Sequence, residues 1–219
     1  MSKKIGMKKK LNRKIYVILD TEVINQKKLD IFQISDKLAL YGIDMFQLRA
    51  KNVCDNDLLA VARKLSKIIH RRKKIFIVND RADIAYLSGA DGIHLGKDDI
   101  SVSDARKILG KKKIVGKTTH SLDELRYYQK QELDYVSIGP VFKTKTKPQL
   151  ASLTNSRHLR GMIENVKRDF FVIGGIDLSN IIKLKGLGVK NISVCRSILL
   201  SKNYKNIVER FKKCLAEVF

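Results

Sequence analysis

Proline is almost missing from this sequence, and tryptophan is absent. The two prolines, Pro140 and Pro148, fall in one short stretch, and no linker-like run interrupts the 219 residues. Boundaries between domains are commonly marked by exposed segments rich in proline, glycine and polar residues. We therefore expect a single domain over residues 15–219, preceded by a basic, disordered tail of residues 1–14.

Cysteines and long apolar runs are also scarce. Cys54, Cys195 and Cys214 are odd in number, far apart, and form no CxxC pair. This pattern excludes a disulfide framework and a structural zinc site. No apolar run approaches the ~20 residues that a transmembrane helix needs. These absences predict a soluble protein with reduced thiols, without a membrane partner and located in the cytoplasm.

Acidic residues are half as numerous as basic ones, 22 against 45, which gives a formal net charge of +23. A basic surface can bind the phosphate backbone of nucleic acids. Here, however, the lysines are spread over nearly every segment, without interleaved aromatics or a nucleic-acid-binding motif. The charge therefore favours phosphorylated small molecules as substrates over a specific nucleic-acid partner. A non-catalytic nucleic-acid-binding protein remains the alternative from another class.

Short apolar runs alternate with amphipathic stretches along the chain. The apolar runs are Ile15–Leu19, Met45–Leu48, Ile75–Val78, Gly92–Leu95, Lys113–Val115, Tyr135–Ile138, Phe170–Ile173 and Asn191–Val194. The amphipathic stretches are Leu29–Leu40, Leu58–Ile69, Arg81–Leu87, Val102–Leu109, Leu122–Gln131, Leu159–Asn165, Asn180–Leu187 and Tyr204–Ala216. Apolar runs with little alternation are typical of parallel strands buried on both faces. Eight strand-then-helix units predict an α/β protein, a (βα)₈ TIM barrel, rather than an open doubly wound sheet.

The carboxyl ends of the strands carry the functional residues of such barrels. Gln47, Arg49 and Lys51 follow the second apolar run at alternating positions, so their side chains share one face. Arginine offers a bidentate fork and lysine a point charge, which together suit a doubly charged phosphate group. A solvated strand end is the simpler alternative.

Two carboxylates stand at the ends of the third and fourth runs. Asp80 follows Asn79, and Asp99 follows the segment His94–Asp98. Mg²⁺ commonly takes one or two carboxylates together with substrate phosphates. Capping of the next helix is the alternative for Asp80. We expect His94 to be a packed or hydrogen-bonded strand residue, because no second His or Cys lies at ligand spacing.

The later strand ends are rich in hydroxyls, cations and glycine. Residues 139–148 form the longest expected loop, which alternates hydroxyl and cationic side chains. The loops after the seventh and eighth strands form the recurrent phosphate site of these barrels. The candidates are Thr118, Thr144, Thr146, Lys147, Gly175, Cys195 and Arg196. For Thr118, a purely structural role beside a helix start is an equal alternative.

Five segments taken together resemble the thiamine-phosphate synthase (thiamine-phosphate pyrophosphorylase) family. They are FQLRAKN, IVNDRADIAYLSGADGIHLGKDD, IVGKTTHSLDE, LDYVSIGPVFKTKTKP and FFVIGGI, in the order of that family, from about Ile15 to Ile198. The resemblance implies a TIM-barrel transferase that depends on Mg²⁺. It would join 4-amino-2-methyl-5-(diphosphooxymethyl)pyrimidine to hydroxyethylthiazole phosphate, releasing pyrophosphate by a dissociative mechanism.

The resemblance also implies roles for individual residues. The pyrimidine diphosphate would be held by Gln47, Arg49, Lys51, Asn79, Thr118 and Lys147, of which Arg49, Lys51 and Lys147 would be catalytic. Mg²⁺ would be bound by Asp80 and Asp99. The thiazole phosphate would be held by Thr144, Thr146, Gly175, Cys195 and Arg196.

Four positions depart from the usual pattern of the family. Lys97 stands in place of Gln, Lys143 in place of Pro, Thr118 in place of Ser, and Arg196 in place of Ser. Arg196 is the largest change and lies in the expected thiazole-phosphate turn. The nearest alternative function is that of the sister family of thiazole tautomerases, which share the barrel but lack the full diphosphate and metal set. The sequence leaves open a homo-oligomer and the choice between carboxylated and plain thiazole.

Overall fold

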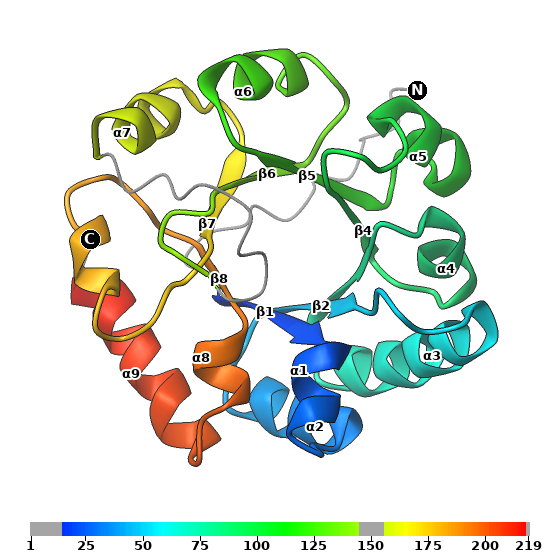
Figure 1. Cartoon of the computed structure of the whole chain (residues 1–219). Helices are drawn as coiled ribbons and strands as arrows, with labels where there is room; N and C mark the ends of the chain where they lie inside the picture. The colour runs from blue at the N-terminus through cyan, green and yellow to red at the C-terminus, as the bar shows by residue number, and fades with distance from the viewer. Residues whose placement is uncertain (1–14, 145–155, 218–219) are drawn as a thin grey trace, which may run out of the picture.

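Eight parallel strands close into a barrel in the computed structural model, which describes residues 15–144 and 156–217 (Figure 1). The strands are β1 (Ile15–Asp20), β2 (Met45–Arg49), β3 (Ile75–Asn79), β4 (Gly92–Leu95), β5 (Ile114–Thr119), β6 (Tyr135–Ile138), β7 (Asp169–Ile173) and β8 (Ile192–Val194). Each strand pairs with the next one in the sequence, and β8 closes the barrel by pairing Val194 with Val17 of β1. The predicted TIM barrel is thereby confirmed.

Helices surround the barrel on its outside (Figure 1). They are α1 (Thr21–Gln26), α2 (Ile31–Leu40), α3 (Asp55–Arg71), α4 (Ala82–Leu87), α5 (Val102–Leu109), α6 (Leu122–Tyr128), α7 (Ser156–Asn165), the 3₁₀ helix η1 (Ile181–Leu184), α8 (Arg196–Leu199) and α9 (Tyr204–Glu217). The prediction of a full helix over Asn180–Leu187 is wrong. Gly186 and Gly188 have φ values of 74° and 70°, which the right-handed helix does not allow.

The strands are buried on both faces, which explains their unbroken apolar runs. All six residues of β1 and all four of β4 and β6 are buried. One large apolar cluster lies between the strands and the helices, and a smaller one fills the inside of the barrel. The inner cluster consists of Tyr16, Met45, Ile77, Tyr135 and Phe171. Because side chains fill the barrel, ligands are confined to its ends.

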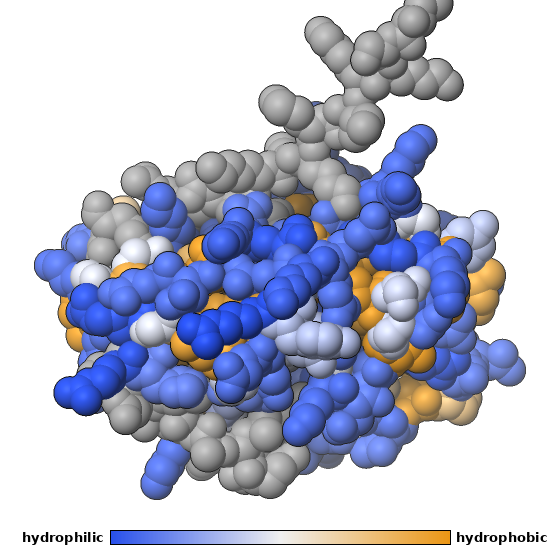
Figure 2. Space-filling model, turned by 90° about the horizontal axis from the view of Figure 1, so that it is seen from above, coloured by the Kyte–Doolittle hydropathy of each residue, from blue (hydrophilic) through white to orange (hydrophobic). Residues whose placement is uncertain are grey.

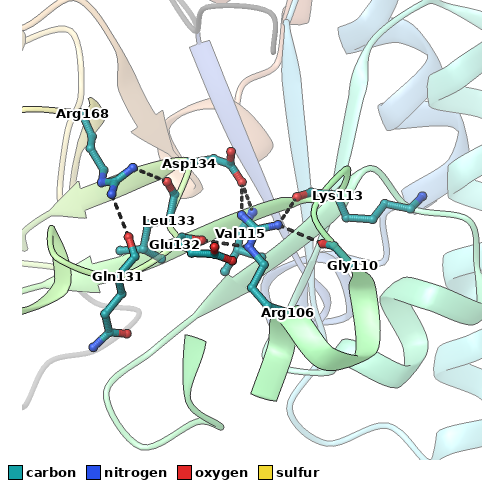
Figure 3. A network of polar contacts seen from close by, with 9 residues as sticks. All are labelled: Arg106, Gly110, Lys113, Val115, Gln131, Glu132, Leu133, Asp134 and Arg168. Carbon is teal, nitrogen blue, oxygen red and sulfur yellow. Dashed lines mark hydrogen bonds and ion pairs between the residues drawn. The ribbon is translucent and has the colours of Figure 1, made fainter. Parts of the chain in front are cut away.

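Two arginines fasten the loops at the amino ends of the strands (Figure 3). Arg106 pairs with Asp134 at 2.5 Å, and these side chains are 9% and 13% exposed. Arg106 also donates to the carbonyl oxygens of Gly110, Lys113 and Glu132. Arg168 donates to three carbonyl oxygens within residues 129–133. These bonds give side-chain donors to backbone carbonyls in the loops before β5 and β6.

The outer surface is mostly hydrophilic on the face seen in Figure 2, where apolar side chains appear in scattered spots. Within the described ranges, no helix has the length and apolar character to cross a bilayer.

Candidate active site

A cavity of about 450 Å³ opens at the carboxyl ends of the strands. Nine of the predicted site residues line it, from β2, β3 and β5 and from the segments after β3, β6, β7 and β8: Gln47, Arg49, Asn79, Asp80, Thr118, Thr144, Gly175, Cys195 and Arg196. Lys51 and Asp99 do not line the cavity, but both contact Asp80, which does. Thr146 and Lys147 lie outside the described residues. The order of strands and helices alone has thus brought these nine distant residues to one cavity.

Asp20 holds Arg49 in place at the cavity wall. Its Oδ2 accepts a hydrogen bond of 2.7 Å from Arg49 Nη1, and its side chain is 1% exposed. Its Oδ1 accepts from the backbone N–H groups of Glu22 and Val23, which caps α1. One buried carboxylate therefore caps α1 and also orients the Arg49 guanidinium. The bond to Arg49 is charge-assisted, and such bonds are stronger than those between neutral groups.

Asp80 has its carboxylate in the site rather than on the next helix. Its φ is 65°, an uncommon left-handed conformation, and its backbone N–H donates to His94 O at 2.9 Å. The carboxylate accepts a hydrogen bond from Lys51 Nζ. The N-cap of α4 is Arg81, without a side-chain capping bond. The capping alternative for Asp80 is therefore wrong.

The carboxyl of Asp99 contacts that of Asp80. Asp99 Oδ2 accepts a hydrogen bond of 2.5 Å from the backbone N–H of Gly96. Burial raises the pKa of Asp99, and the hydrogen bond with Asp80 raises it further. Two acidic groups thus converge at the ends of β3 and β4. No third His, Cys, Asp or Glu joins a cluster in residues 15–144 and 156–217.

The loop that carries Asp99 is held by Lys117. Its Nζ donates to Gly96 O at 2.5 Å, and the side chain is 2% exposed. Burial lowers the pKa of Lys117, whereas the nearby Asp99 acts in the opposite direction. The lysine thus fixes the turn whose backbone N–H binds Asp99.

His94 is a hydrogen-bonded strand residue, as predicted. Its Nε2 lies 2.7 Å from Thr118 Oγ1, and its Nδ1 lies 3.0 Å from the hydroxyl of Tyr135. Another histidine, His120, also lines the cavity. Its Nδ1 donates to Gly139 O at 2.5 Å, so it joins the end of β5 to the loop after β6.

The loop after β6 packs directly on the Gly174–Gly175 turn. Val141 N donates to Ile173 O and Phe142 N donates to Gly174 O. A Cβ on Gly175 would lie 2.2 Å from Lys143 O, and Gly175 has a φ of 63°. Glycine is therefore required here for close approach of two backbones, in addition to any role toward an anion.

Cys195 and Arg196 also line the cavity, at the start of α8. Burial raises the pKa of the Cys195 thiol to about 12, so it remains a neutral thiol near pH 7. A nucleophilic role for this cysteine is thereby disfavoured. Ser197 fixes the turn by donating to Ile176 O at 2.8 Å.

Comparison with known proteins identifies the group to which this site belongs. A family model described as thiamine monophosphate synthase matches residues 15–198. A thiamine-phosphate synthase of Halalkalibacterium halodurans is 32% identical over 204 residues, which are 93% of this chain and 96% of that protein. The chain belongs to the thiamine monophosphate synthase family.

Two further comparisons agree with this family. A thiamine-phosphate synthase of Prochlorococcus marinus is 41% identical over 160 residues, 72% of this chain; the match spans only 45% of that longer protein. The solved structure of thiamine phosphate pyrophosphorylase from Pyrococcus furiosus is 27% identical and has a TM-score of 0.83. That comparison covers 95% of this chain and 98% of the other.

Several residues of this family member were not singled out from the sequence. Asp20, Lys117 and His120 act on the site through Arg49, the Asp99 loop and the loop after β6. Their only signal in the sequence is a polar residue at the end of an apolar run. That signal does not say which residues a side chain will contact.

Proposed function

We propose that this chain is a thiamine-phosphate synthase. It transfers a pyrimidinylmethyl group from its diphosphate ester to the ring nitrogen of hydroxyethylthiazole phosphate. The observation that supports this most is that Arg49 and Asp80 line one cavity of about 450 Å³ and that Asp99 contacts Asp80. A guanidinium suits a phosphate group, and paired carboxylates suit the divalent ion that accompanies a diphosphate. Family membership supports the same substrates.

In the proposed reaction, the bond between the methylene carbon and the diphosphate oxygen breaks first, and its electron pair leaves with pyrophosphate. The pyrimidine ring stabilises the cationic carbon that remains. The lone pair of the thiazole nitrogen then forms the new C–N bond. No proton has to be removed before either step, so the site must stabilise a leaving anion and align two rings. Arg49, Lys51 and Lys147 would supply that stabilisation.

Asp80 and Asp99 would hold Mg²⁺. Their carboxyls contact each other, and the pKa of Asp99 is raised by burial first and by Asp80 second. A pair of this kind fits Mg²⁺, which uses few carboxylates and fills its other positions with water and substrate phosphate. When bound, the ion would supply positive charge to the departing pyrophosphate.

The metal assignment can be tested without turnover. We expect Asp99→Asn to weaken Mn²⁺ binding in the presence of pyrophosphate by about tenfold or more, measured by the free Mn²⁺ signal in electron spin resonance. Asp98→Asn is the matched control, because Asp98 is an exposed neighbour. Equal Mn²⁺ affinity in Asp99→Asn and the native protein would refute the assignment.

The thiazole phosphate would bind on the other side of the cavity. Thr144, Gly175 and Arg196 line that side, from the loops after β6, β7 and β8. Thr146 is assigned there from the family resemblance. The backbone N–H of Gly175 and the Arg196 guanidinium offer donors of the kind that phosphate oxygens accept.

Titration of the pyrimidine diphosphate in the presence of Mg²⁺, followed by calorimetry, tests this proposal against the tautomerase alternative. We expect saturable binding that Arg49→Ala weakens by about tenfold or more. Arg126→Ala serves as the control, because Arg126 is an exposed residue of α6. A tautomerase has no diphosphate to bind, so an undetectable signal would favour that sister function.

A further inference from the structure

A series of four hydrogen bonds crosses the inside of the barrel and joins two residues of the cavity wall. Gln47 Nε2 lies 2.6 Å from the hydroxyl of Tyr16, which lies 3.1 Å from that of Tyr135. The Tyr135 hydroxyl lies 3.0 Å from His94 Nδ1, and His94 Nε2 lies 2.7 Å from Thr118 Oγ1. Gln47 and Thr118 face the cavity from β2 and β5.

The chemistry of the groups gives this series a direction. An amide nitrogen only donates, so Gln47 donates to Tyr16. With Gln47 as its donor, the Tyr16 hydroxyl has its single proton left for Tyr135, and Tyr135 then has its own proton for His94 Nδ1. An imidazole that accepts at Nδ1 carries its proton on Nε2, and this nitrogen then donates to Thr118.

Both phenols keep the protons that this direction requires. Tyr16 and Tyr135 are each about fully buried, and burial raises the pKa of both hydroxyls above the ordinary value. A buried hydroxyl without a partner would be costly, so the series also satisfies groups that water cannot reach.

Packing holds the two phenols in this geometry. The ring centroids of Tyr16 and Tyr135 lie 5.2 Å and 5.3 Å from that of Phe171, in edge-to-face arrangements. Gly116 leaves room for Tyr135, since a Cβ there would lie 2.1 Å from its ring carbon Cζ. Neither ring can turn away without displacing the inner core.

The ends of the series are left with defined hydrogen-bonding roles. Thr118 Oγ1 accepts from His94, so its own proton is available to an acceptor in the cavity, such as a phosphate oxygen. Gln47 Nε2 is used by Tyr16, so its Oε1 is available to a donor. Among the described residues, no group pairs with Gln47 Oε1 or with the Thr118 proton.

We propose that Tyr16 and Tyr135 are positioning residues that act through this one-directional series: they fix the proton of His94 on Nε2, make Thr118 a donor toward the diphosphate, and make Gln47 an acceptor. This inference rests on the proposed function for the identity of the ligand. The direction of the series itself is a property of the free protein.

The position of the His94 proton is the first test. Two-bond ¹H–¹⁵N spectra of the full chain distinguish the two imidazole tautomers, and His94→Gln identifies its signals among the four histidines. We expect the Nε2–H tautomer in the native protein and a mixture of tautomers in Tyr135→Phe. Tyr204→Phe, which removes a hydroxyl that donates to Leu199 O outside the series, should leave His94 unchanged.

A native His94 with its proton on Nδ1, or a native mixture, would overturn the proposed direction. In the reversed series, Gln47 Oε1 would accept from Tyr16 and Thr118 would donate to His94. This measurement needs no substrate, so it separates failure of the series from failure of the proposed function.

The second test is a double-mutant cycle on the binding of inorganic pyrophosphate with Mg²⁺. Tyr135→Phe and Thr118→Val should each raise the Kd by about tenfold, and the double variant should raise it no further, because both remove the same oriented donor. Thr118→Ser, which keeps the hydroxyl, should bind as the native protein does. Thermal unfolding confirms that each variant is folded.

Additive losses in the double variant, or an unchanged Kd in Tyr135→Phe, would overturn the positioning role. Loss of core packing alone would lower the unfolding temperature, but it would not make the effects of the two substitutions on the pyrophosphate Kd non-additive. Failure of the native protein to bind pyrophosphate would contradict the role toward a diphosphate and the proposed function together, while the tautomer result still decides the direction.

Discussion

Single residues of the site serve two structural purposes at once, and Asp20 is the clearest case. One of its oxygens caps α1 and the other binds Arg49. Asp20→Asn keeps a side chain suited to capping but loses the charge that holds the guanidinium. We expect the Kd for the pyrimidine diphosphate to rise by about tenfold, with little change in the unfolding temperature.

Asp30→Asn provides the control for this prediction. Asp30 caps α2 through the same two kinds of backbone bond but contacts no cavity residue in the described chain. A diphosphate Kd that is unchanged in Asp20→Asn would mean that Arg49 needs no partner to bind.

Arg196 is the residue at which this chain departs most from the usual family pattern. Residue 196 lines the cavity in the structure. A hydrogen bond to a charged group contributes ~1.5–3 kcal/mol. We expect Arg196→Ser to raise the KM for thiazole phosphate by about tenfold, or about 1.4 kcal/mol, without raising the KM for the diphosphate.

Steady-state kinetics with each substrate varied in turn measures this effect. Arg210→Ser is the matched control, because it removes an exposed arginine of α9 by the same substitution. An unchanged KM for both substrates would rule out a contact between Arg196 and the phosphate.

At the scale of the elements, all eight strands could be predicted, whereas the short helices α1 and α8 could not. Strands such as β1 are buried on both faces, so their apolar runs are visible in the sequence. The helix α8 has four residues, fewer than a helical pattern needs to repeat. The apolar run predicted for β5 ends at Val115, but the strand continues to Thr119. Its last four residues, GKTT, have no apolar pattern and could not be recognised as strand.

The same contrast holds for the site. Arg49 and Asp80 were found because strand order places them at one end of the barrel. The bond between Tyr16 and Tyr135 spans 119 residues and arises only when β1 and β6 face each other across the closed barrel. A pattern along the chain records which side chains are polar, but it does not record which ones meet.

We expect contacts at the amino ends of the strands to stabilise the barrel and to have no effect on substrate binding. Arg106→Ala removes the charge partner of Asp134 from a nearly buried pair and leaves three carbonyl oxygens without their donor (Figure 3). Breaking a buried pair in this way costs about 3 kcal/mol or more. We expect a lower free energy of unfolding in urea and unchanged KM values.

Lys107→Ala is the control on the same helix, α5. Its ion pair with Asp104 is exposed, with the lysine side chain 76% accessible, and exposed pairs contribute little. If both variants had the same urea midpoint as the native protein, the Arg106 network would not stabilise the barrel.

For the whole molecule, the net charge of +23 makes weak, non-specific binding to nucleic acid an expected property. We expect binding to duplex DNA that falls steeply with salt, is lost near physiological ionic strength, and largely disappears when residues 1–14 are deleted. Fluorescence anisotropy over a salt series measures this. Sequence-selective binding at physiological salt would favour the non-catalytic alternative instead.

In the proposed function, the cavity joins a pyrimidine diphosphate to a thiazole phosphate. A coupled assay of pyrophosphate release, with thiamine phosphate quantified in the same samples, tests it most directly. We expect the two products in equal amounts only when both substrates and Mg²⁺ are present, and a steep loss in a folded Asp99→Ala variant. Absence of thiamine phosphate from the complete mixture with folded native protein would contradict the claim.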